Sequence, residues 1–394
     1  MNSLYILCIA LVYCDGDKIF AQDFQVNIPE IEGIKVEMGE SILIPNSESA
    51  LAFKFADGRI VVGQGKNAMW SYDGGYTWRQ GPEGPDEKVA IDLGNGEILS
   101  ISRNTRRDTE NRFKVRQKRS KDNWQTVETE TGQVAMSYVS YTVTGGGDRI
   151  DGFLFHHGII KLADGALKAT MYGNYEGDVE LCDGYPPELG QRKYRTVVVT
   201  SNDNGRTWGN PVLVAYDKML GRGIPDDHPL AEAGFADERI KPTAIVPAIT
   251  QEGFREADIV QAANGDLICM MRTGGRNGGT LNLFPTPMYC SRSADAGQSW
   301  TPPAQVADRG VCPNLVVLNN GIIVCTYSRP GNWLIFSDDH GVTWQGAFQF
   351  GTTRDYNYIE EVAPNVVQVY HETVENGAKR VRGTFFTVTR EPRD

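Results

Sequence analysis

The sequence predicts an all-β protein built as a six-bladed β-propeller, in which six four-stranded sheets close into a ring. Three observations support this fold class: a hairpin phrase that recurs along the chain, a turn phrase that alternates with it, and a high glycine content. The 43 glycines suit a protein with many tight turns, because turn positions often require a positive φ angle. A ring of seven blades is the alternative.

The hairpin phrase is an apolar residue, then Asp or Asn, then Gly and a second apolar run. It reads FADGRIVVG, LGNGEILSI, LADGALKAT, AANGDLICM and LNNGIIVCT, with a weaker copy, APNVVQVY. Asp-Gly or Asn-Gly between two apolar runs predicts a β-hairpin. We therefore expect each copy to join two strands, with turns at Gly58, Gly96, Gly165, Gly265 and Gly321 and near Asn365.

The turn phrase follows the pattern S-x-D-x-G-x-T/S-W. Its copies are SYDGGYTW, SNDNGRTW, SADAGQSW and SDDHGVTW, with a degenerate copy, SKDNWQT. The Asp can accept hydrogen bonds from nearby backbone N–H groups, the Gly supplies an unusual φ, and the Trp packs against the hairpin base. One copy follows each of the first five hairpins, which predicts five complete blades and one incomplete blade. An N-terminal strand within residues 24–38 is expected to complete the last blade and remove its open edge.

This pattern resembles the Asp box of the sialidase-like (neuraminidase, BNR-repeat) β-propeller superfamily, over nearly the whole mature chain. The resemblance implies that the Asp boxes are structural and lie at the blade periphery. It also implies a protein that acts on carbohydrate, with its site at one end of the central channel.

The N-terminal run LYILCIALVYC has the length of a signal-peptide core and is too short to span a bilayer. The expected organisation is therefore a signal peptide over residues 1–22 and one propeller domain over residues 23–394, secreted or exported to the periplasm. No other segment is expected to span a membrane. A monomer is expected, with a glycan or polysaccharide as its partner.

Charge and cysteine content exclude other classes of function. The formal net charge of −11 argues against a nucleic-acid partner. The five cysteines after the signal peptide are odd in number and lack C-x-x-C spacing, which argues against a disulfide framework or a zinc site. No metal or cofactor is predicted. The basic tract from Arg103 to Arg119 predicts a solvated hairpin, with a cradle for an acidic glycan as the alternative.

Four positions resemble the parts of a sialidase site. Glu256 resembles the Glu that partners a Tyr nucleophile, and Arg272 resembles an Arg that binds the substrate carboxylate. Arg329 resembles a second such Arg, and Tyr358, in the segment RDYNYIEEV, resembles the nucleophile. Arg255 is a further predicted substrate-binding residue. The near neighbours that a small misalignment would substitute for Tyr358 are Tyr356, Glu360 and Glu361.

Such a set is chemically coherent. A Tyr hydroxyl has an ordinary pKa of about 10 and is a poor nucleophile at neutral pH, but a neighbouring carboxylate can take its proton. Tyr nucleophiles are a known exception to the two-carboxylate rule of glycosidases. The planar guanidinium of Arg binds a carboxylate through two parallel hydrogen bonds.

Two parts of the sialidase pattern are missing. Leu43 stands where the pattern has an Arg, and the loop GQGKNAMW lacks the expected acid. His156 and His157 begin an innermost strand and could replace the acid, because His is the usual general acid or base near neutral pH. Adjacent strand residues face opposite ways, so only one of the two is expected to face the channel. We assign His157 to catalysis, and His156 and Tyr172 to substrate binding.

Three functions remain open. The first is a glycoside hydrolase that uses Tyr358, Glu256 and the Arg pair to release an acidic or neutral sugar, with an acidic sugar favoured by the Arg pair. The second is a polysaccharide lyase on uronic-acid polymers that uses His157, Tyr172 and the same Arg residues. The third is a non-catalytic propeller that binds glycans.

Overall fold

The computed structural model describes residues 25–85, 89–143, 148–182, 190–216, 252–274, 287–329, 331–353, 356–375 and 377–392. Within these residues the regular structure is β-strand apart from one short 3-10 helix, η1 (Gly65–Asn67). The prediction of an all-β chain is therefore confirmed. The predicted signal peptide, residues 1–22, lies outside the described residues.

Four of the sheets hold four strands each, an eight-stranded sheet consists of two four-stranded meanders, and β10 and β11 form a two-stranded sheet of their own. The strands of the first three four-stranded groups are β2 (Ala52–Lys54), β3 (Ile60–Val62), β4 (Met69–Ser71) and β5 (Arg79–Gln80); β6 (Val89–Gly94), β7 (Glu97–Thr109), β8 (Arg112–Ser120) and β9 (Glu128–Ala135); β12 (Leu154–Lys161), β13 (Leu167–Gly173), β14 (Arg195–Ser201) and β15 (Thr207–Ala215). The remaining strands are β16 (Arg255–Gln261), β17 (Leu267–Arg272), β18 (Met288–Ser293) and β19 (Ala304–Ala307); β20 (Val311–Val317), β21 (Ile323–Ser328), β22 (Asn332–Ser337) and β23 (Gln345–Gly351); β24 (Tyr358–Ala363), β25 (Val366–Glu375), β26 (Ala378–Arg390) and β1 (Ile34–Ile44); and the separate pair β10 (Tyr141–Val143) and β11 (Arg149–Asp151).

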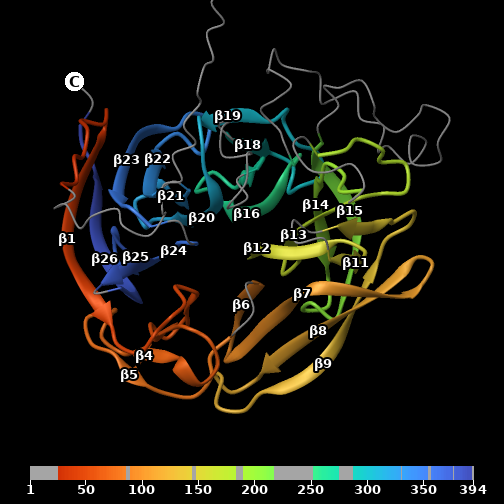
Figure 1. Ribbon diagram of the computed structural model, residues 1–394, viewed down its shortest axis with the longest axis horizontal. Helices are drawn as coiled ribbons and strands as arrows, with labels where there is room; N and C mark the ends of the chain where they lie inside the picture. The colour runs from red at the N-terminus through yellow and green to blue at the C-terminus, as the bar shows by residue number, and fades with distance from the viewer. Residues whose placement is uncertain are drawn as a thin grey trace, which may run out of the picture.

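The groups of strands are arranged around a common centre, with β1 (red) beside β26 (blue) in Figure 1. The first strand of each four-stranded group, from β2 to β24, contributes residues to the same cavity of about 210 Å³. These innermost strands therefore surround a central channel, as in a propeller.

The N-terminal strand completes the C-terminal sheet. Strand β1 pairs antiparallel with β26, from Ile34 opposite Arg390 to Ile44 opposite Val381. The sequence placed this strand within residues 24–38, whereas it begins at Ile34 and continues to Ile44. The pairing joins the two ends of the described chain and covers an edge of the last sheet, which would otherwise present unpaired backbone groups.

The predicted hairpins are confirmed. In each group the first two strands are antiparallel neighbours joined at the predicted turn. The five glycines of these turns have φ between 79° and 92°, and Asn365 has φ 63°. Asn is the residue other than Gly that adopts this left-handed conformation most readily, which explains why the sixth copy works without a glycine.

The Asp-box turns join the third and fourth strands of five groups and share one hydrogen-bond pattern. In the copy that follows β14, the hydroxyl of Ser201 accepts a hydrogen bond from the backbone N–H of Gly205 and donates one to the side chain of Asp203. Asp203 also accepts two hydrogen bonds from Thr207, from its N–H at 2.8 Å and from its hydroxyl at 2.6 Å. The degenerate copy makes the same bonds through Ser120, Asp122 and Thr126. Burial raises the pKa of Asp203, but the bonds from Thr207 and Ser201 outweigh it, so the pKa lies below its ordinary value.

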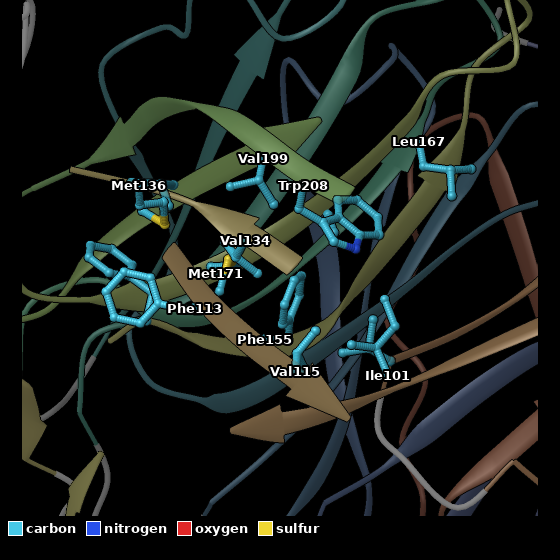
Figure 2. Close-up of a cluster of buried hydrophobic side chains, with 14 of the residues drawn as sticks. Ile101, Phe113, Val115, Val134, Met136, Phe155, Leu167, Met171, Val199 and Trp208 are labelled. Carbon is cyan, nitrogen blue, oxygen red and sulfur yellow. The ribbon is translucent and has the colours of Figure 1, made fainter. Parts of the chain in front are cut away.

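Neighbouring groups of strands pack through apolar side chains. Figure 2 shows the cluster between the meander β6–β9 and the meander β12–β15, where Phe113 and Val115 lie near Phe155 and Trp208. The rings of Phe155 and Trp208 are 5.6 Å apart, and Trp208 is 2% exposed. The Trp of this Asp box thus contributes to the core between two meanders, beyond the packing against its own hairpin base that the sequence predicts.

Side chains also bond neighbouring groups together around the channel. At each of the six junctions a side chain of one group bonds to a backbone group of the next, in or beside the innermost strands. The pairs are Ala56 N–H to Asp92, Lys161 to Leu93 O, Thr170 to Ala257 O, Leu315 N–H to Asp258, Ile359 N–H to Asn314, and Lys54 N–H to Glu360.

We expect Asp203→Ala to lower the free energy of unfolding by about 1–2 kcal/mol at neutral pH, because the variant leaves the N–H and hydroxyl of Thr207 without their acceptor. The deficit should narrow as the pH falls below about 4, because a carboxyl whose pKa is lowered in the folded state stabilises it only while ionised. Urea unfolding at pH 7 and pH 3 measures both effects. The exposed Asp308→Ala is the control and should change stability little; equal losses in the two variants would contradict the structural role of the Asp box.

Candidate functional site

Glu256 lies at the centre of a group of charged side chains beside the channel. It is 4% exposed, and its Oε2 accepts hydrogen bonds from Arg272 Nη1 at 2.8 Å and from the hydroxyl of Tyr356 at 3.2 Å. Burial would raise the pKa of Glu256, but Arg272, Arg255 and His156 lower it well below its ordinary value. Glu256 is therefore a carboxylate at neutral pH.

A second buried carboxylate, Glu252, holds the two guanidinium groups in place. Its Oε2 lies 2.5 Å from Arg255 Nη2 and 3.3 Å from Arg272 Nη2. The predicted substrate-binding residue Arg255 is thus 5% exposed and committed to an ion pair, with Tyr194 beneath its guanidinium at 5.1 Å. The sequence reasoning missed Glu252, although the segment EGFREAD places two Glu and one Arg within five residues.

Register shifts in the innermost strands bring these side chains to the site. In β16, two residues, Glu256 and Ala257, stand opposite one residue of β17, and in β20 Cys312 and Pro313 do the same against β21. Glu256 has φ 47° and Cys312 has φ 52°, which residues other than Gly seldom adopt. Such bulges redirect side chains and are frequent beside active sites.

The two histidines lie side by side rather than on opposite faces. In β12, three residues from His156 to Gly158 stand opposite the single Thr170 of β13, and His157 has φ 49°. Strand alternation therefore fails here, and the two rings are 4.1 Å apart. His156 Nε2 lies 3.9 Å from Glu256 Oε2, whereas His157 Nε2 contacts the thiol of Cys312 at 3.2 Å and His157 lines the channel. The assignment of His157 to catalysis stays a prediction.

The pairing predicted between Tyr358 and Glu256 needs correction. The tyrosine that bonds to Glu256 is Tyr356, which lies two residues before the start of β24 and is half-buried. Tyr358 is 6% exposed, stacks on His157 with a ring separation of 5.4 Å, and lines the channel. Residues two apart in an extended segment share a face, so the sequence places both rings on one side without indicating which of them reaches Glu256.

Two further arginines lie close to Tyr356. The guanidinium carbon of Arg329, a predicted site residue, is 5.1 Å from the Tyr356 ring. Arg103 of β7 donates a hydrogen bond to the hydroxyl of Tyr172, its only hydrogen-bond partner among the described residues, while its Nε is buried without one. Arg103 belongs to the tract predicted to be a solvated hairpin, but it is half-buried at the site, which fits the alternative of an anion cradle better at this one position.

Two carboxyls line the channel behind this group. Asp258 accepts hydrogen bonds from the backbone of Leu315 and the side chain of Asn314, and Glu360 accepts one from the backbone of Lys54. Burial raises the pKa of Asp258 to about 6 and the pKa of Glu360 to about 7. Asp258 and Glu256 do not form the carboxylate pair that their spacing suggests, because the bulge at Glu256 and Ala257 separates them in register.

The arrangement can move a proton and bind an anion. The Tyr356 hydroxyl already donates to a carboxylate, and Arg272 and Arg329 lie close enough to stabilise a developing phenolate. Among the described residues no group of three His, Cys, Asp or Glu side chains could hold a metal ion, and the five cysteines there are free thiols. The described part also contains no helix long and apolar enough to cross a membrane.

No protein-family model matches the sequence, and a comparison with curated proteins finds no match. Solved structures do match. A protein of unknown function from Dyadobacter fermentans is 16% identical with a TM-score of 0.57, over 91% of this chain and 100% of that one. The GH93 α-L-arabinofuranosidase of Fusarium graminearum, in complex with arabinobiose, is 13% identical with a TM-score of 0.54, over 88% and 97% of the two chains.

The α-L-arabinanase of Penicillium chrysogenum, complexed with arabinobiose, is 12% identical with a TM-score of 0.54, over 89% of this chain and 98% of that one. At such identities the likeness concerns the fold alone. The fold is that of the sialidase-like β-propellers, as the Asp boxes predict.

We expect the free energy of unfolding to fall as the pH rises from 4.5, the ordinary pKa of a Glu side chain, to about 7, the pKa of Glu360 in the folded protein. Over that interval the folded state holds a proton that the unfolded state releases. Glu360→Gln should make this decline shallower, because the amide does not titrate. Glu361→Gln, a neighbour that does not line the channel, is the control and should keep the wild-type slope. Urea unfolding at half-unit pH steps gives the slopes, and identical slopes in all three proteins would contradict the prediction.

Proposed function

We propose that this chain is a carbohydrate-active enzyme, a glycoside hydrolase in which Tyr356 and Glu256 form the catalytic pair. The observation that carries the proposal is the hydrogen bond of 3.2 Å from the Tyr356 hydroxyl to a buried, ionised carboxylate that Arg272 holds in place. Two of the structural neighbours, an α-L-arabinofuranosidase and an α-L-arabinanase, support a glycosidase in general terms.

In the proposed reaction the phenolic oxygen of Tyr356 attacks the anomeric carbon of the bound sugar. Its proton passes to Glu256, a new bond forms between Tyr356 and the sugar, and the bond to the leaving oxygen breaks, with the leaving oxygen taking a proton from solvent. Water then attacks the same carbon, displaces Tyr356 and gives one proton to solvent, while Glu256 returns its proton to Tyr356. Arg272 compensates the charge that moves between Glu256 and Tyr356.

The half-buried arginines support an acidic sugar as the substrate. Among the described residues, Glu252 and Glu256 balance Arg255 and Arg272, whereas no carboxylate lies within ion-pair distance of Arg103. A guanidinium that is removed from water without a counter-charge is costly, so a bound anion would be favoured there. We assign Arg103, Arg272 and Arg329 to the substrate carboxylate.

A lyase acting on uronic-acid polymers is the second candidate, and the position of His156 favours it. The His156 ring lies 6.0 Å from the Tyr172 ring and 6.4 Å from the Tyr356 ring, so a base and a phenolic acid are both near the same space. The product distinguishes the two reactions, because elimination creates an unsaturated uronate that absorbs ultraviolet light and hydrolysis does not. Ultraviolet absorbance that rises in step with new reducing ends would favour the lyase.

We expect Tyr356→Phe to reduce kcat by at least about 1,000-fold, because the variant keeps the ring and removes the nucleophilic oxygen. Tyr358→Phe is the matched control, two residues along on the same face, and should retain kcat within about threefold. Release of reducing sugar from a panel of acidic and neutral glycans measures both, with circular dichroism to confirm folding. Wild-type turnover in Tyr356→Phe, or loss of turnover in Tyr358→Phe alone, would remove Tyr356 from the mechanism.

We also propose that the ring has six blades and that the protein is secreted or exported to the periplasm. Six groups of four strands, each with an innermost strand at the same cavity, support six blades, the last closed by β1. We propose that residues 23–394 form this one domain. Secretion or export to the periplasm is supported by the apolar run between Leu4 and Cys14.

A further inference from the structure

A groove of about 720 Å³ lies at the outermost strands, far along the sheets from the catalytic group. Its walls are the tip of the β7–β8 hairpin, the segment after β9, and the middle of β15. Glu256 belongs to an innermost strand and Tyr356 lies two residues before one, whereas β9 and β15 are the fourth strands of their groups. The groove is therefore separate from the site of the proposed reaction.

The groove exists because two outer strands pair only briefly. Strands β9 and β15 are parallel neighbours at two positions, Gln133 with Thr207 and Val134 with Trp208. Beyond them, Asn210 and Pro211 stand opposite a single residue of β14, which bends β15 at this point. The groove opens where the pairing of the two strands ends, and the β7–β8 hairpin forms its other wall.

The lining has the chemistry of a site for sugar. Five of the ten lining residues carry a hydroxyl or amide side chain, and Tyr138 is 40% exposed. Among the described lining residues none is acidic and only Arg112 is basic. Hydroxyls and amides can both donate and accept, as sugar hydroxyls do, and an exposed aromatic ring offers an apolar face for a pyranose or furanose ring. The absence of carboxylates from these lining residues contrasts with the net charge of −11 of the whole chain. The polar lining residues are Thr109, Asn111, Arg112, Ser137, Tyr138 and Asn210.

We infer that this groove is a second glycan-binding site, which holds a segment of a polysaccharide chain while another part of the chain reaches the catalytic group. The volume lies within the range of about 300–1,000 Å³ that is typical of small-molecule sites and suits an oligosaccharide. When one protein molecule binds the same polysaccharide at two sites, the effective concentration of the polysaccharide at the catalytic group rises. Short substrates, which cannot reach both sites, gain nothing from the groove.

The test measures binding without turnover. The background is Tyr356→Phe, and the probes are linear arabinan, polygalacturonate and chondroitin sulfate, followed by affinity gel electrophoresis. We expect Tyr138→Ala to weaken the binding of at least one probe by about tenfold, which corresponds to about 1.4 kcal/mol. Tyr72→Ala is the matched control, because it makes the same substitution at a tyrosine that lies outside the groove and is 53% exposed. Thermal melting of each variant confirms that it is folded.

Binding that is equal in the Tyr138→Ala and Tyr72→Ala proteins would overturn the inference, and so would failure of the Tyr356→Phe protein to bind any of the three probes. An effect of Tyr138→Ala on a protein or lipid ligand alone, with glycan binding unchanged, would also overturn it. Because no step requires catalysis, the result is independent of the roles of Tyr356 and Glu256. In otherwise wild-type protein, Tyr138→Ala should lower kcat/KM for the polymer and leave kcat/KM for a disaccharide unchanged.

Discussion

The contacts between neighbouring innermost strands are the constraint on which the rest of the molecule depends. These strands are the first strands of different four-stranded groups, so the regular ladders of a sheet do not join all of them to one another. Side chains such as Asp258, Asn314 and Glu360 reach the backbone of the next strand instead. Each of these bonds connects segments that are far apart in the sequence, and together they fix the spacing around the channel. The distance between Glu256 and Tyr356, which belong to different groups, depends on that spacing.

Turn chemistry explains why so much of the fold can be predicted. The hairpins and Asp boxes are predictable because they depend on interactions within a few residues. These are a Gly or Asn at a positive φ, and an Asp that accepts hydrogen bonds from the backbone of its own turn. The start of β1 was harder to predict from the sequence, because β1 pairs with β26, a segment more than 300 residues away. The same limit applies to contacts within the site.

The site was predictable where it depends on residue type and not where it depends on register. Glu256, Arg272 and Arg329 were predicted from their resemblance to a sialidase site, and the structure brings them to the same tyrosine or to one another. The choice between His156 and His157 turned on which way one residue faces, whereas Tyr356 and Tyr358 share a face and differ in which of them reaches Glu256. Bulges in β12 and β16 change that direction by inserting residues into one strand only, and a sequence pattern with a strict period of two does not register them.

The charges around Tyr356 restrict how the proposed nucleophile can be activated. Burial and the neighbouring Glu256 raise the pKa of Tyr356, while the arginines hold the pKa of Glu256 far below its ordinary value. Transfer of the proton from Tyr356 to Glu256 is therefore unfavourable in the resting protein, and the phenol keeps its proton. A substrate carboxylate that bonds to Arg272 would weaken the hold of Arg272 on Glu256 and make Glu256 a stronger base. In the proposed reaction, the binding of an acidic sugar thus activates the nucleophile, so that binding energy is used to lower the barrier rather than only to hold the substrate.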